Sequence, residues 1–134
     1  MASARWITLV VAAFIVVVPN LMDWGPTHIF NDDWTGHARL HTAWQLSMQT
    51  IFAIVAFVFA WRGKVSEAAV INLVILVSFF IAGLLNAAGV FEGAYTDMTD
   101  GSTQIGGIDG NLLAFSILLF LQVLAIGRAR QANA

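Results

Sequence analysis

Two histidines, His37 and His41, are the residues of this sequence best placed to do chemistry. They lie four positions apart in a segment with helical character, so their imidazoles are expected to share one helix face. Neutral imidazole nitrogens at this spacing are frequent ligands of transition metals such as zinc and copper. Asp33 lies one turn before the pair and Gln45 one turn after it. The spacing therefore predicts a polar stripe that enters an otherwise apolar helix.

The residue types leave three chemistries open for this pair. The two imidazoles can chelate a metal ion, or one can bind haem iron axially while the other donates hydrogen bonds. They can also act as acid and base without a metal, on a lipid substrate. Asp33 is equally consistent with a ligand, a base or a plain helix N-cap. His28 lies in a loop beside Pro26, where solvation alone explains it, and its role is left open.

Arg39 lies two residues from each histidine, so on a helix it points away from their face. This position suits an anchor at the membrane interface, a partner for Asp32, or contact with a haem propionate.

Two further polar residues are candidates for orienting a substrate. Asn86 lies near the end of an apolar stretch, and a buried amide needs partners, so it is expected to point at the histidine-bearing helix or at a ligand. Asp109 precedes the last apolar stretch, where it or Asn111 can cap a helix and where its carboxylate can return over the site. Asn72 lies far from both and is expected to be structural.

The elements that must position these residues are four apolar stretches. Each is long enough, or nearly so, to cross a hydrocarbon core that needs about 20 helical residues. Of the 134 residues, 59% are hydrophobic and 10% charged, whereas a soluble domain has about 25% charged residues. We expect an all-α polytopic membrane protein, a single domain over residues 1–134 that forms a four-transmembrane-helix bundle. The first stretch is expected to be a retained helix rather than a cleaved signal. The four expected helices cover residues 6–22, 34–61, 67–91 and 111–127.

Composition excludes several classes of function. The net charge of −2 and the lack of a basic tract exclude nucleic-acid binding. The sequence has no cysteine, which excludes disulfides, thiolate catalysis and iron–sulfur clusters.

The charged residues predict an orientation in the membrane. Lys and Arg favour the cytoplasmic side of membrane helices. An even number of helices with both termini in the cytoplasm of a bacterial-type plasma membrane places five cations together there: Arg5, Arg62, Lys64, Arg128 and Arg130. The opposite side then receives Arg39 and seven carboxylates, at Asp23, Asp32, Asp33, Glu92, Asp97, Asp100 and Asp109. The aromatic residues expected in interfacial belts are Trp24, Trp34 and Tyr95 on that side, and Trp6 and Trp61 on the cytoplasmic side.

The segment Trp34-Thr-Gly-His-Ala-Arg-Leu-His41 resembles the histidine-bearing segment of styrene oxide isomerases. The similarity includes an asparagine late in the third helix, here Asn86. It also includes a loop that ends in Gly-Ile-Asp109 before a helix opening Leu-Leu-Ala-Phe-Ser. The segment from Thr27 to His41 also resembles small uncharacterised four-helix membrane proteins.

The isomerase resemblance implies a trimer of four-helix subunits that holds haem b through His41. It implies a reaction in which ferric haem acts as a Lewis acid, opens an aryl epoxide and yields an aldehyde after a hydride shift.

Two classes of function follow from the sequence. The first is an isomerase-like enzyme in which His41, with His37 and Arg39, binds haem b or alternatively zinc or copper. Asn86 and Asp109 would then orient a small lipophilic substrate that enters from the lipid bilayer. The second is a non-catalytic accessory subunit whose polar end docks a partner in a membrane complex. A homo-oligomer, by the resemblance a trimer, is expected for the enzyme.

Overall fold

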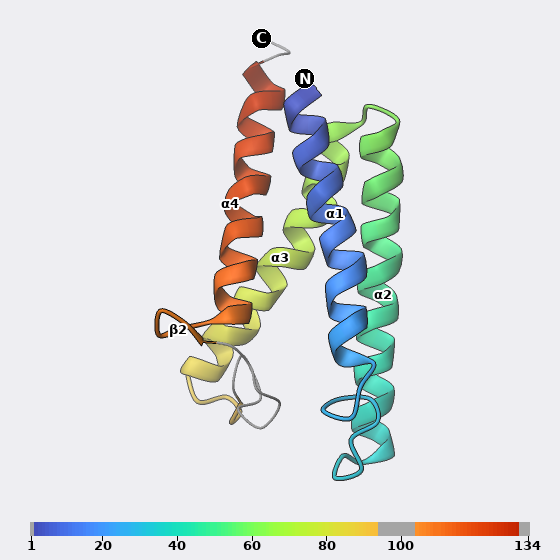
Figure 1. Ribbon diagram of the computed structural model, residues 1–134, viewed down its shortest axis with the longest axis vertical. Helices are drawn as coiled ribbons and strands as arrows, with labels where there is room; N and C mark the ends of the chain where they lie inside the picture. Colours follow the sequence, from blue (N-terminus) through green and yellow to red (C-terminus); the bar gives the residue numbers. More distant parts are fainter. Residues whose placement is uncertain (1, 94–103, 132–134) are drawn as a thin grey trace.

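The computed structural model describes residues 2–93 and 104–131 and shows a bundle of four helices (Figure 1). The helices are α1 (Ala2–Asp23), α2 (Gly36–Trp61), α3 (Val65–Ala87) and α4 (Gly110–Gln131). All four are long and apolar enough to cross a membrane. The predicted all-α, four-helix membrane bundle is therefore confirmed. Three residues named above, Tyr95, Asp97 and Asp100, lie outside the described part of the chain.

Two predicted helix boundaries on the histidine side of the chain are wrong. α2 begins at Gly36 rather than residue 34, because Thr35 is its N-cap and accepts a hydrogen bond from the Ala38 amide through its hydroxyl (3.2 Å). The N-cap role considered for Asp33 therefore belongs to Thr35. α3 ends at Ala87 rather than residue 91, because Gly89 has a positive φ of 73° and the chain leaves the helix there.

The helix ends away from the histidines extend beyond the predicted limits. α1 begins at Ala2 and α4 continues to Gln131, so each of these helices is longer than its apolar stretch. The short segment before α4 forms a two-stranded hairpin, β1 (Gln104–Ile105) and β2 (Ile108–Asp109), in which Gln104 pairs with Asp109. Gly106 and Gly107 both have positive φ, as the tight turn of such a hairpin requires.

The course of α3 decides which elements meet at each end of the bundle. α3 starts next to the end of α2, crosses the bundle obliquely and finishes beside the start of α4 (Figure 1). Both termini and the α2–α3 turn lie at one end, which we call the basic end. The α1–α2 loop, the start of α2 and the hairpin lie at the other, which we call the histidine end.

Small residues form much of the helix contact surface. Fully or almost fully buried alanines occur on all four helices, at positions 4, 12, 53, 56, 60, 68, 69, 125 and 129. Small side chains let helix backbones approach closely, which is the usual way to pack helices in a membrane. Only 22–28% of each apolar span is buried inside the bundle, so most of the remaining apolar surface faces lipid.

A polar cluster lies inside the bundle, between α1, α3 and α4. Thr8, Asn72 and Gln122 are all fully buried. The Asn72 side-chain amide donates to the Gln122 side-chain oxygen (2.8 Å) and to the Thr8 carbonyl (3.2 Å). Gln122 donates in turn to the Thr8 hydroxyl (3.3 Å). These contacts join three helices, so the structure supports the expectation that Asn72 is structural.

Candidate functional site

The two histidines of α2 converge at the histidine end. The Nε2 atoms of His37 and His41 lie 3.0 Å apart, and the two rings are nearly perpendicular at 79°. The pairing predicted from their spacing is therefore confirmed. Both side chains are exposed on the outer surface of the single chain, and Trp44 lies one turn further along, with its ring 5.9 Å from that of His41.

The separation of the two nitrogens suits the chelation of one metal ion. Two imidazoles bound to zinc at about 2.0–2.1 Å, with an angle of about 90–110° between them, have nitrogens about 2.9–3.3 Å apart. The observed 3.0 Å falls in this range. The same distance also suits a hydrogen bond in which one Nε2 donates and the other accepts, with the roles set by the tautomers. The arrangement can thus hold an ion or transfer a proton.

Haem b fits this arrangement less well than a single ion does. His41 would hold a haem through Nε2, and His37 Nε2 lies only 3.0 Å from that atom. A haem bound through His41 would leave His37 without a role as a ligand, whereas a single chelated ion would use both nitrogens.

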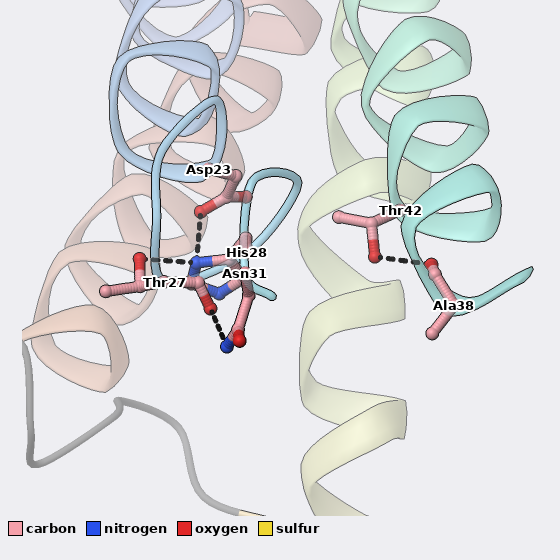
Figure 2. A network of polar contacts seen from close by, with 6 residues as sticks. All are labelled: Asp23, Thr27, His28, Asn31, Ala38 and Thr42. Carbon is pink, nitrogen blue, oxygen red and sulfur yellow. Dashed lines mark hydrogen bonds and ion pairs between the residues drawn. The ribbon is translucent and has the colours of Figure 1, made fainter. Parts of the chain in front are cut away.

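His28 belongs to a separate polar cluster below the end of α1 (Figure 2). Its Nδ1 lies 3.0 Å from the Thr27 hydroxyl and 3.9 Å from an Asp23 carboxylate oxygen. The Asn31 side-chain amide closes the cluster by donating to the Thr27 carbonyl (3.3 Å). Figure 2 shows this group apart from the first turns of α2.

The described residues contain no group of three or more His, Asp or Glu side chains that could together hold a metal ion. His28 and Asp33 thus do not join His37 and His41 in such a group. Asp33 is exposed in the loop, where its backbone amide donates to the Asn31 side chain (2.9 Å).

Of the two targets predicted for Asn86, the histidine-bearing helix and a ligand, the first is wrong. Its side-chain amide donates to the Gly93 carbonyl (2.9 Å) and so fastens the segment that follows α3. The reason is the oblique course of α3, which carries its last turn toward α4 and away from the start of α2 (Figure 1).

Asp109 caps α4, as one of the two predicted cap residues. Its carboxylate accepts hydrogen bonds from the Asn111 amide (2.9 Å) and the Leu112 amide (3.0 Å). Asn86 and Asp109 thus lie at the α3–α4 side of the histidine end, and the histidine pair lies at the α2 side (Figure 1). Within one chain, the structure does not bring the expected catalytic residues to the expected ligands.

Arg39 is half-buried beside the pair but forms no ion pair in the part of the chain that the structure describes. Of the three roles considered for Arg39, the partner for Asp32 is therefore not formed, and the interfacial anchor and the haem-propionate contact stay predictions. Gln45 continues the outward polar face one turn beyond His41 and is exposed.

Comparison with known proteins gives a family but no activity. Residues 7–95 match the model of DUF6640, described as a family of unknown function. The chain belongs to DUF6640. This DUF6640 region contains most of α1, all of α2 and α3, and the histidine pair, and it ends before the hairpin, Asp109 and α4. No curated protein and no solved structure matches the chain.

The sequence did not lead us to predict one polar contact between α1 and α2, which lies further into the bundle than the histidine pair. The Asn20 side-chain amide donates to the Thr50 hydroxyl (2.7 Å), and Asn20 accepts from the Trp24 indole (3.0 Å). The available signal was a lone asparagine next to Pro19 in an apolar helix, which needs a partner because lipid offers none.

Proposed function

We propose that this chain is a membrane-embedded enzyme in which His37 and His41 hold a transition metal ion that acts on a small lipophilic substrate, such as an aryl epoxide. The observation that carries the proposal is the 3.0 Å separation of the two Nε2 atoms on the outward face of α2. The resemblance of the Trp34–His41 segment to styrene oxide isomerases supports the substrate class.

A metal bound there supplies Lewis acidity, which polarises an oxygen atom of the substrate. Isomerisation of an epoxide to an aldehyde needs no other reactant, because the substrate and the product contain the same atoms. His37 and His41 would hold the ion through their Nε2 atoms. The exposed Leu40 and Trp44 beside them offer apolar surface to the substrate.

The position of the site favours substrates that dissolve in lipid. His41 and Trp44 are exposed on the outside of the bundle, so a molecule partitioned into the bilayer reaches them without crossing a protein wall. The orientation that agrees with the charged residues puts the basic end in the cytoplasm of a bacterial-type plasma membrane and the histidine pair near the opposite interface.

A homo-oligomer completes this site in the proposal. Polar side chains that face lipid cost free energy, and His37, His41 and Gln45 all face outward from the single chain. A neighbouring copy would shield these side chains on one side and leave the other side open to the bilayer. In a ring of copies, Asn86 and Asp109 of one subunit can approach the histidine pair of the next, because they lie on opposite sides of the bundle (Figure 1). The isomerase resemblance suggests three copies.

A second candidate is a metal-free enzyme that uses the pair as acid and base on a lipid. The direct contact between the imidazoles supports it, since one nitrogen donates and the other accepts. Metal dependence separates this candidate from the first.

Activity tests the proposal directly. The purified chain in detergent, supplied with Zn²⁺ or Cu²⁺, is expected to convert styrene oxide to phenylacetaldehyde, measured by gas chromatography. His41→Ala is expected to abolish this conversion, and His28→Ala, which alters a histidine outside the pair, to retain it. Equal conversion by the wild type and the His41 variant would refute the role of the pair. Conversion by a metal-stripped sample would favour the metal-free candidate.

A further inference from the structure

Five of the six Lys and Arg residues of the chain gather at the basic end: Arg5, Arg62, Lys64, Arg128 and Arg130. They come from three places in the sequence that Figure 1 shows together, namely the start of α1, the α2–α3 turn and the end of α4. Among the described residues at this end, the only carboxylate is Glu67, and none of the five cations forms an ion pair. The basic end therefore carries a net positive charge.

Arg5 is held in a fixed position at this end. Its Nη2 donates to the carbonyl of Trp61 (2.6 Å), the last residue of α2, and its guanidinium carbon lies 5.3 Å from the centre of the Trp61 ring. A carbonyl at a helix C-terminus has no partner within the helix, so this bond satisfies it. The Nε of Arg5 is buried and has no hydrogen-bond partner among the described residues. The contacts with Trp61 thus hold the positive charge of Arg5 in one place at the basic end.

Exposed apolar surface continues from these cations toward the middle of the bundle. Trp6 and Val10 of α1 are 59% and 58% exposed, and Trp61 is 56% exposed. The Trp61 ring stacks on that of Phe57, with the two rings 9° from parallel. A flat aromatic surface at the interface with an apolar strip behind it suits the glycerol and acyl chains of a lipid.

We propose that the basic end binds an anionic phospholipid, with its phosphate beside Arg5, Arg62 and Lys64 and its chains along the exposed strip of α1 and α2. The charge selects an acidic headgroup, since Lys and Arg side chains near a membrane surface attract anionic lipids. The anchored Arg5 gives this attraction a defined location. This binding surface lies at the opposite end of the bundle from the histidine pair (Figure 1).

The test uses the full-length chain in mixed micelles and native mass spectrometry to count retained lipid. The probes are phosphatidylglycerol and, as the neutral comparison, phosphatidylcholine with the same chains. The wild type is expected to retain phosphatidylglycerol preferentially. The double variant Arg62→Gln/Lys64→Gln, whose side chains are exposed, is expected to bind it at least on the order of ten-fold more weakly. Arg39→Gln removes the cation at the other end and is the matched control.

Three outcomes would overturn the proposal. The first is equal retention of the two lipids by the wild type. The second is a loss in Arg39→Gln as large as in the double variant, which would indicate net charge rather than a surface at the basic end. The third is displacement of phosphatidylglycerol by inorganic phosphate, which would mean that the ligand is a free anion. The measurement does not depend on metal or on epoxide conversion.

Discussion

Replacing His41 with alanine is expected to lower the affinity of the chain for Zn²⁺ by more than about 100-fold. Loss of an outer-shell partner of a metal ligand costs roughly 10–100-fold, and loss of one of two chelating ligands should cost more. Because His41 is exposed and packs on no buried core residue, the variant is expected to insert and fold normally. Competition with a chromogenic chelator in detergent measures the affinity.

His28→Ala is the matched control for this variant, because His28 contacts Thr27 and Asp23 rather than the pair. It is expected to keep the wild-type affinity. His37→Ala is expected to behave like His41→Ala, since chelation needs both nitrogens. A His37 variant with unchanged Zn²⁺ affinity would contradict chelation and leave His41 acting alone.

Asn72→Leu is expected to lower the free energy of unfolding by about 1–3 kcal/mol. The substitution keeps the number and branching of the side-chain heavy atoms but removes the amide that donates to Gln122 and to the Thr8 carbonyl. The Gln122 oxygen is then buried without this donor, in a bundle surrounded by lipid. Unfolding by sodium dodecyl sulfate in mixed micelles, followed by circular dichroism, measures the change.

A double substitution separates the effect of the hydrogen bond between Asn72 and Gln122 from the effect of side-chain packing. In Asn72→Leu/Gln122→Leu both partners are apolar, so no amide is left unsatisfied. The double variant is expected to lose less stability than the sum of the two single variants. Strict additivity would show that the hydrogen bond between these residues does not couple α3 to α4. Ser78→Ala, which removes only a bond to the Ile75 carbonyl of the same helix, should leave stability nearly unchanged.

The sequence was sufficient for the four helices because lipid imposes one strong condition, an apolar run of about 20 residues. The sequence was less reliable at helix ends, because a single residue can determine where a helix begins or ends. The prediction extended α3 to residue 91 because Val90 and Phe91 are apolar. The structure ends it earlier, with Gly89 at positive φ and the Val90 amide donating to the Leu85 carbonyl (3.0 Å). Gly89 was the visible signal of that ending.

The histidine pair was predictable and the rest of the site was not, for a physical reason. His37 and His41 are related by one turn of one helix, so their convergence depends only on helix geometry. The direction of Asn86 depends on how α3 crosses the bundle, which is set by packing between helices. The spacing of residues along the chain does not determine how the helices cross. Asn86 contacts Gly93 instead of α2.

Elemental analysis of the purified wild-type chain tests whether His37 and His41 hold a metal ion. An absorption spectrum of the same sample, before and after reduction by dithionite, tests for haem. The account predicts a stoichiometric transition metal that is lost in His41→Ala, and no Soret band. A metal-free, colourless sample that cannot be loaded with Zn²⁺ or Cu²⁺ would contradict it and would favour an accessory subunit. A Soret band that shifts on reduction would contradict the single-ion site and establish haem in its place.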